Sequence, residues 1–342
     1  MLIIFVGGLE FTTRMIFNSN TVLNINIGGF KKYHSTRRTQ LKENYKAKNI
    51  STNSYGILGP EFKLEPNPKG IRILSIGNSV TFAPPERNYS NVLEEKLSKY
   101  FPNNDVEVIV GAVPGYSSYE ILDWYNEFLY KLKPDITIIH IGWNDMGQFH
   151  PFGLRYKNEP LSYKKRTLSG FLMKYFYFLR IPYFFIGRIE RNKPVDTSPL
   201  TSDEKGVLDE FIPNAYTTNL TILIRKLKEQ GSIVYLSTLA GLITYPQTDE
   251  ELIRMQFARG MKRKLEIYKA VYKKYEEALE EVAINTETQI IDLRELIRNP
   301  NQRDIFTDVM HINVKGSELY GDYIAEKIKT KVGEILTLKI IN

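Results

Sequence analysis

The chain has 342 residues, of which 42% are hydrophobic and 25% are charged, a composition typical of a globular protein with one large domain and an appendage. It contains no cysteine, which excludes a disulfide framework and a thiolate metal site. The formal net charge of +7 comes from basic residues spread among nearly as many acids. We interpret it as a solvated surface and predict no nucleic-acid partner.

Residues 1–17, MLIIFVGGLEFTTRMIF, begin with an apolar run that ends at Glu10. The run is too short to span a bilayer and lacks the basic start of a signal peptide. Two interpretations stay open, the last turns of a membrane helix or an amphipathic helix packed on the domain. The polar, turn-rich residues 18–69 predict an extended arm, so that 1–69 forms an N-terminal apolar segment and arm.

Five short apolar runs follow, rich in β-branched residues, at 71–77, 106–113, 136–142, 232–239 and 288–293. Their near-continuous hydrophobicity is typical of strands buried on both faces. Helix-like segments alternate with the strands, at 89–101, 117–132, 261–282 and 315–332. This alternation predicts an α/β three-layer sandwich with a central, mostly parallel sheet of about five strands. The domain is expected over 70–335, with an insertion at about 146–205.

Polar residues and glycine stand where these strands end. Ser79 follows the first strand in ILSIGNSVTF, Gly115 follows the second, and Asn144 follows the third in GWND. Asp308 and His311 lie close together in FTDVMH, before the last helix. Because ligands of parallel sheets bind beyond the carboxyl ends of the strands, we expect these residues to converge on one edge. Together they are the parts of nucleophilic acyl transfer.

Each of these residues also has a structural interpretation. A serine after a strand is commonly a helix cap, Gly115 after a proline is commonly part of a turn, and Asn144 and Asp145 are common caps. Their joint occurrence in this order at the strand ends favours catalysis. His140, inside a strand, and His150, in a loop, are interpreted as structural.

The blocks GNS, a later Gly, GWND and DVMH resemble those of the SGNH hydrolases, also called the GDSL family, from about residue 71 to 332. The resemblance implies a flavodoxin-like fold and a serine esterase. It makes Ser79 the nucleophile, His311 the base and Asp308 the partner that orients the base. It also implies an oxyanion hole made by the backbone amides of Ser79 and Gly115 and by the side chain of Asn144.

Two positions depart from the family pattern. The aspartate usual before the serine is Asn78 here, and the glycine often found four residues after the serine is Ala83. Neither position supplies a catalytic group, so the chemistry implied by the resemblance is retained. The segments NSYGILGPEF and AVPGYSSYE look like the membrane-linked, cell-envelope branch of the family.

The resemblance predicts a hydrolase of ester bonds that removes an O-acyl group, such as acetyl, from a carbohydrate or an envelope component. An O-acyltransferase on the same scaffold and a lipase-like acylhydrolase stay open as alternatives. The complete set of site residues disfavours a non-catalytic glycan-binding protein. Serine chemistry needs neither cofactor nor metal, and we predict none. The motifs leave open the acyl group, its carrier and the oligomeric state.

The aromatic stretch at 168–189 has two interpretations, a helix packed beside the site or a patch that binds apolar substrate or membrane. Lys174, Arg180 and Pro182 interrupt it, which argues against a transmembrane helix. Together with the apolar N-terminus it suggests membrane contact. We therefore expect a membrane-anchored or extracytoplasmic protein, with a cytoplasmic location left open.

Overall fold

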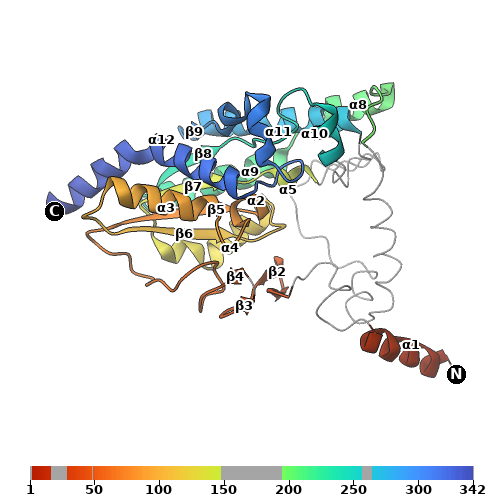
Figure 1. Cartoon of the computed structure of the whole chain (residues 1–342), viewed down its shortest axis with the longest axis horizontal. Helices are drawn as coiled ribbons and strands as arrows, with labels where there is room; N and C mark the ends of the chain where they lie inside the picture. The colour runs from red at the N-terminus through yellow and green to blue at the C-terminus, as the bar shows by residue number, and fades with distance from the viewer. Residues whose placement is uncertain (1, 17–28, 48, 148–194, 256–263, 342) are drawn as a thin grey trace.

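The computed structural model describes residues 2–16, 29–47, 49–147, 195–255 and 264–341 (Figure 1). At its centre is a parallel sheet whose strands are β5 (Ile71–Gly77), β6 (Val106–Ala112), β7 (Ile136–His140), β8 (Ile233–Ser237) and β9 (Gln289–Ile291). Their spatial order is β6-β5-β7-β8-β9, and every neighbouring pair is parallel. The five predicted strands and the predicted class of sheet are confirmed.

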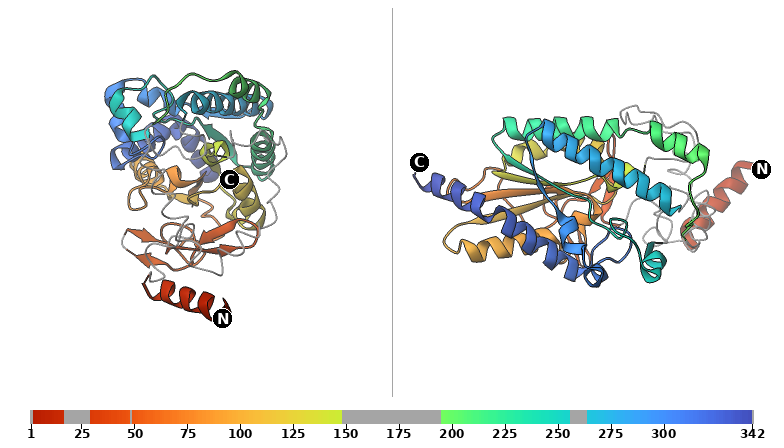
Figure 2. Two further views of the ribbon diagram at one scale, coloured as in Figure 1. Left: turned by 90° about the vertical axis from the view of Figure 1, so that its right-hand side faces the viewer. Right: turned by 90° about the horizontal axis from the view of Figure 1, so that it is seen from above.

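Helices cover both faces of the sheet, which gives three layers (Figure 2). On one face, α3 (Tyr89–Tyr100) packs beside α12 (Val314–Ile341). On the other face, α9 (Asn214–Glu229) lies between α4 (Ser118–Glu127) and α11 (Leu265–Asn285). Right-handed crossovers produce this division, because β5 leads to β6 in one direction across the sheet and the later strands follow in the opposite direction.

The described part of the domain also contains shorter helices: α2 (Ser79–Phe82), α5 (Trp143–Met146), α8 (Ser202–Glu210), α10 (Asp249–Arg254), and the 3₁₀ helices η1 (Leu129–Leu132), η4 (Leu293–Ile297) and η5 (Pro300–Ile305). The helix expected over 117–132 is divided, since α4 ends at Glu127 and η1 follows it. The helix expected over 315–332 is longer, because α12 continues to Ile341.

Helix α9 is absent from the elements predicted from the sequence. Its buried side chains include Tyr216, Leu220, Leu223, Ile224 and Leu227, which recur at helical spacing. This stripe packs against the sheet and makes α9 the crossover that connects β7 to β8. The sequence therefore indicates this helix through apolar residues that recur at helical spacing.

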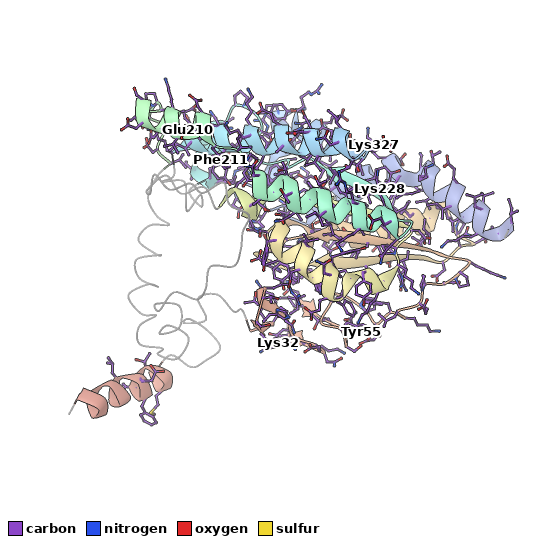
Figure 3. The ribbon with its side chains drawn as sticks, turned by 180° about the vertical axis from the view of Figure 1, so that it is seen from behind. Lys32, Tyr55, Glu210, Phe211, Lys228 and Lys327 are labelled. Atoms are coloured by element: carbon purple, nitrogen blue, oxygen red, sulfur yellow. The ribbon has the colours of Figure 1, made fainter. Side chains whose placement is uncertain are left out.

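The arm before the first central strand is folded into two antiparallel hairpins rather than extended throughout. They are formed by β1 (Lys31–His34) with β2 (Arg38–Leu41), and by β3 (Lys46–Ala47) with β4 (Ile50–Ser51). An antiparallel bridge joins Leu58 to Val110 of β6, so the arm is attached to the central sheet. In Figure 3, Lys32 and Tyr55 of the arm lie on the opposite side of the domain from Lys327 of α12.

The N-terminal helix α1 (Leu2–Ile16) presents exposed apolar side chains at Leu9, Phe11 and Met15. Among the residues that the structure describes, no helix combines the length and the apolar character needed to cross a membrane. His150 and the aromatic stretch at 168–189 lie outside the described residues, so the expectations for them stay predictions.

Helix α12 links the two edges of the sheet. It begins soon after His311, at the carboxyl edge, and buries Ile324 and Ile328 on its way across the face. Near its other end, the Lys339 Nζ donates to the carbonyl oxygen of Gly70 at 3.0 Å and lies 2.7 Å from Asp135 Oδ1. Both of these partners precede strands, at the amino edge of the sheet.

Candidate active site

The pairing register brings three strand ends to the same level. In the central strand β5, Gly77 lies opposite Ala112 of β6 and opposite His140 of β7. Ser79 begins α2 immediately beyond that level, and the turn with Gly115 lies beyond β6 on the same side. The sequence expectation that the strand-end residues share one edge is therefore met by the backbone.

The candidate site residues are partly accessible, whereas several of their neighbours in the chain are buried. Ser79, Asn144, Asp308 and His311 are half-buried, and Gly115 is exposed. The adjacent residues Asn78, Val80, Tyr116, Trp143 and Asp145 are buried. This pattern leaves these polar groups open to a ligand while buried neighbours hold the adjoining chain in place.

Ser79, His311 and Asp308 form a continuous chain of hydrogen bonds. The Nε2 of His311 lies 2.7 Å from the Oγ of Ser79. The Nδ1 of the same ring lies 2.7 Å from the Oδ2 of Asp308. With a proton on Nδ1 donated to the carboxylate, Nε2 can accept the proton of the serine hydroxyl. The structure thus places the hydroxyl, the imidazole and the carboxylate in the order that proton removal from Ser79 requires.

A tight loop before α12 holds Asp308 and His311. Phe306 and Ile312 form an antiparallel bridge across it, and the Thr307 N–H donates to the His311 carbonyl at 2.8 Å. The second carboxylate oxygen of Asp308 accepts the backbone N–H of His311 at 2.9 Å. Burial alone would raise the pKa of Asp308, but the hydrogen bonds from His311 outweigh it and hold the pKa below its ordinary value. Asp308 is therefore ionised at neutral pH.

The expected oxyanion donors lie at the same edge. The Asn144 Nδ2 donates to the Tyr116 carbonyl at 2.9 Å, a bond that uses one of its two hydrogens and orients the amide. Gly115 has φ +90, a conformation that other residues rarely adopt, and this turns the chain sharply after β6. Ser79 opens α2, where a backbone N–H has no intrahelical acceptor.

The local sequence explains how Ser79 is presented. A Cβ at Gly77 would lie 1.8 Å from the Oγ1 of Thr81, so only glycine permits the close return of the chain into α2. Asn78, the departure from the family's aspartate, caps α2 by accepting the Val80 N–H at 3.2 Å. The substitution therefore retains the acceptor that the turn needs.

Asp145 has a role that the sequence did not reveal. It is a fully buried carboxyl that accepts the Ser118 hydroxyl at 2.5 Å and the Ser118 backbone N–H at 3.1 Å. Asn219 of α9 donates to the same hydroxyl at 3.1 Å. Burial raises the pKa of Asp145 to about 7, against the opposing effect of these hydrogen bonds. Asp145 thus ties the turn that carries Asn144 to the start of α4.

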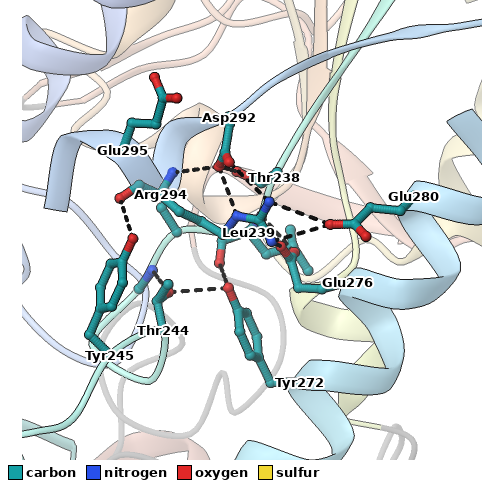
Figure 4. A network of polar contacts seen from close by, with 12 residues as sticks. Thr238, Leu239, Thr244, Tyr245, Tyr272, Glu276, Glu280, Asp292, Arg294 and Glu295 are labelled. Carbon is teal, nitrogen blue, oxygen red and sulfur yellow. Dashed lines mark hydrogen bonds and ion pairs between the residues drawn. The ribbon is translucent and has the colours of Figure 1, made fainter. Parts of the chain in front are cut away.

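A polar network from α11 supports the loop after β8 (Figure 4). Glu276 accepts the Leu239 N–H at 3.0 Å and an Arg294 guanidinium N–H at 2.8 Å. The Tyr272 hydroxyl donates to the Leu239 carbonyl at 2.9 Å, and its ring stacks on Trp143 with centroids 5.9 Å apart. The network therefore also supports the short helix α5 that carries the asparagine of the site.

His140 is not part of the Ser79–His311–Asp308 chain. It is fully buried, and its Nδ1 lies 2.9 Å from the Ser237 Oγ. Burial lowers the pKa of His140 to about 4, so the ring is neutral at pH 7. Its surroundings agree with the structural interpretation drawn from the sequence.

Comparison with known proteins identifies the class. The GDSL-like Lipase/Acylhydrolase family matches residues 75–319, and the chain belongs to this family. The resemblance to the SGNH hydrolases is thereby confirmed, and the protein is a hydrolase that acts on ester bonds. A search among curated proteins finds no match.

Several solved structures are similar to this chain at low sequence identity. An acetyl xylan esterase is 15% identical with a TM-score of 0.44, over 75% of this chain and 100% of that one. A lipase/acylhydrolase from Enterococcus faecalis is 17% identical with a TM-score of 0.43, over 76% and 96%. A variant of an acetylxylan esterase from Geobacillus stearothermophilus is 16% identical with a TM-score of 0.45, over 76% and 94%.

Proposed function

We propose that the protein is a serine esterase in which Ser79 is the nucleophile, His311 the general base and Asp308 the residue that orients it. The observation that carries the proposal is the uninterrupted chain of hydrogen bonds through both nitrogens of His311, with 2.7 Å at each link. An imidazole bonded to a hydroxyl on one side and to an ionised carboxylate on the other is the arrangement that activates serine.

In the proposed reaction, the Ser79 Oγ attacks the ester carbonyl while its proton passes to the His311 Nε2. The carbonyl oxygen becomes an oxyanion, held by the backbone N–H groups of Ser79 and Gly115 and by the Asn144 amide. Collapse of the tetrahedral intermediate breaks the ester bond, and the proton on His311 goes to the departing alcohol. Water then attacks the acyl-enzyme by the same steps in reverse and releases the free acid.

For the substrate, we propose a small O-acyl group, such as acetyl, on a carbohydrate or another envelope component. The support comes from NSYGILGPEF and AVPGYSSYE, which look like the cell-envelope branch of the family. The second of these segments includes Gly115, so the residues that resemble the cell-envelope branch include one of the proposed site residues. The acceptor of the acyl group determines whether the product is a free acid or a new ester.

Turnover of p-nitrophenyl esters with acyl chains of two to sixteen carbons tests the proposal, with Ser79→Ala as the inactive control. A preference for acetate that requires Ser79 supports a small-acyl esterase, and a preference for long chains favours a lipase. Repeating the assay with an acetylated sugar and a sugar acceptor separates free acetate from transferred acetyl. Activity that is retained in Ser79→Ala contradicts the nucleophile assignment.

We also propose that the protein works outside the cytoplasm and contacts a membrane through its N-terminal segment. The support is the exposed apolar set Leu9, Phe11 and Met15 on α1, since such a helix can bury its apolar side chains in the headgroup region. Cell fractionation of the full chain and of a Phe11→Ser/Met15→Ser variant tests this. Equal amounts of both proteins in the soluble fraction contradict it.

A further inference from the structure

The N-terminal hairpin β1–β2 holds the loop that follows β6. The Lys31 Nζ donates to the Pro114 carbonyl at 2.5 Å. The Tyr116 hydroxyl donates to the Thr39 carbonyl at 2.5 Å and accepts the Arg37 Nε–H at 3.2 Å. Three hydrogen bonds from the arm therefore reach the two residues on either side of Gly115.

Arg37, in the turn between β1 and β2, is the centre of this contact. Its side chain is 2% exposed, and its Nη1 donates to Asp123 Oδ2 at 3.0 Å and to Glu127, both on α4. His34, Asp123 and Glu127 lie close enough together to ligate a metal ion, but the guanidinium contacts all three. The cation at this position is thus supplied by the arm itself.

The loop held by the arm carries one proposed donor of the oxyanion hole and the acceptor that orients a second donor. Gly115 lies between the anchored residues Pro114 and Tyr116, and its backbone N–H is one of the proposed donors. The Tyr116 carbonyl accepts a hydrogen bond from the Asn144 Nδ2 at 2.9 Å and so orients a second proposed donor, the Asn144 amide. A displacement of Tyr116 would therefore move the Gly115 N–H and the Asn144 amide with respect to Ser79.

We propose that the β1–β2 hairpin positions the oxyanion hole, and that Arg37 is a positioning residue acting through Tyr116. The inference rests on the proposed serine mechanism, because it concerns the donors that this mechanism uses. Donors must lie about 2.7 to 3.1 Å from the developing oxyanion, so a displacement of a few tenths of an ångström weakens the stabilisation. The arm supplies this constraint from outside the sheet, by hydrogen bonds to the loop that has Gly115 with positive φ at its centre and by ion pairs to α4, which follows the loop.

A second buried arginine provides the matched control. Arg72 is also 2% exposed, and it joins the arm to the domain through the carbonyl oxygens of Lys63 and Leu64 at 2.5 and 2.7 Å. It lies near the start of β5, at the amino edge of the sheet, away from Ser79. Arg37→Met and Arg72→Met therefore each remove one buried guanidinium between arm and domain, but only the first adjoins the proposed site.

A gentler pair of variants removes single hydroxyls. Tyr116→Phe deletes the group that links Arg37 and Thr39 to the loop and retains the ring that packs against Trp124. Tyr125→Phe is its control, because that hydroxyl belongs to α4 and donates to Gln230 at 2.7 Å, away from the loop. This pair tests the inference even where Arg37→Met does not fold.

The experiment measures kcat and KM for p-nitrophenyl acetate, the inhibition constant of a small boronic acid and the Tm of the full chain. Arg37→Met and Tyr116→Phe should lower kcat about ten-fold or more and weaken boronate inhibition by a similar factor. Their KM should stay within about two-fold of wild type, because the ground-state ester makes little use of the oxyanion donors. The double variant Arg37→Met/Tyr116→Phe should have a kcat close to that of Arg37→Met alone, since the two residues act through one loop.

Arg72→Met and Tyr125→Phe should retain kcat and boronate inhibition within about two-fold, even where their Tm falls. Equal effects of each variant and its control on kcat, once both are folded, overturn the inference and leave the serine mechanism intact. Activity that does not depend on Ser79 overturns the serine mechanism and the inference with it. A separate Ser79→Ala measurement distinguishes the two failures.

Discussion

The imidazole Nε2 of His311 lies 2.7 Å from the hydroxyl oxygen of Ser79, although 232 positions in the sequence separate them. Ser79 belongs to the first turn after the central strand β5, and His311 to the loop before the last helix. The parallel sheet brings the two residues together, so the geometry of the site depends on correct folding of the whole domain.

The first prediction concerns the base and the residue that orients it. His311→Ala and Asp308→Asn should each lower kcat about 10⁴-fold, because the serine loses its proton acceptor or the imidazole loses the charge that holds its tautomer. Asp304→Asn is the control, since that carboxyl is 59% exposed and pairs with Lys315. Steady-state kinetics on p-nitrophenyl acetate tests this. An Asp308→Asn variant with wild-type activity would contradict a role for the Asp308 carboxylate in the mechanism.

The second prediction concerns the amide of the oxyanion hole. Asn144→Ala should lower kcat about 100- to 1,000-fold, which corresponds to about 3 to 4 kcal/mol, with little change in KM. The reason is that the amide hydrogen not bonded to the Tyr116 carbonyl serves the transition state more than the bound ester. Separate determination of kcat and KM tests it. A rise in KM alone would make Asn144 a binding residue.

The third prediction concerns pH and the buried carboxyl of Asp145. Its pKa in the folded protein is about 7, above the ordinary 3.8, so between these values the folded chain keeps a proton that the unfolded chain has lost. The contribution of Asp145 to the free energy of unfolding is therefore greatest below about pH 3.8. It falls as pH rises from there to about 7, by about 1.4 kcal/mol per pH unit.

Asp145→Asn removes this titration, and urea unfolding at pH 5 and pH 8 provides the measurement. The variant should be less stable than wild type at pH 5, since it loses a carboxyl oxygen that accepts hydrogen bonds from Ser118. The difference in free energy of unfolding between the two proteins should be smaller at pH 8, because the rise in pH destabilises only wild type through this group. An equal gap at both pH values would show that Asp145 does not titrate in this range.

The fourth prediction concerns the turn that presents Ser79. Gly77→Ala should lower stability by about 1 to 3 kcal/mol and reduce turnover, because its Cβ would meet Thr81 atoms at 1.8 and 2.5 Å. Gly206→Ala in α8 is the matched control, with nothing within 4 Å of its Cβ, and should retain both properties. Thermal unfolding and esterase turnover test the pair, and similar results for the two variants would contradict the close approach at Gly77.

The central sheet could be predicted because its strands are buried on both faces and therefore read as continuous apolar runs. Every residue of β5 and β7 is buried, including Ser75 and His140. The position of the candidate site followed from the same information, since parallel strands end at one edge. Ser79 and Asn144 follow such strands, at positions where the hydrophobic core gives no reason for a polar residue, so their presence indicates a site.

The supports of the site could not be predicted, because they depend on contacts between distant and irregular segments. Arg37 lies in an arm with short polar strands, and nothing in its local sequence shows that it becomes buried against α4. Asp145 looks like an ordinary helix cap, yet its partner Ser118 belongs to another helix. Such polar contacts have no periodicity that a single sequence could reveal.

Helix α12 has 28 residues and so extends about 42 Å as a single rod. Because one end follows His311 and the other is fixed by Lys339 to Gly70 and Asp135, its length is set at both ends. Inserting or deleting one residue would rotate everything beyond that point by about 100°. Either the Lys339 contacts or the buried apolar face would then be lost, so this helix should tolerate substitutions much better than changes in length.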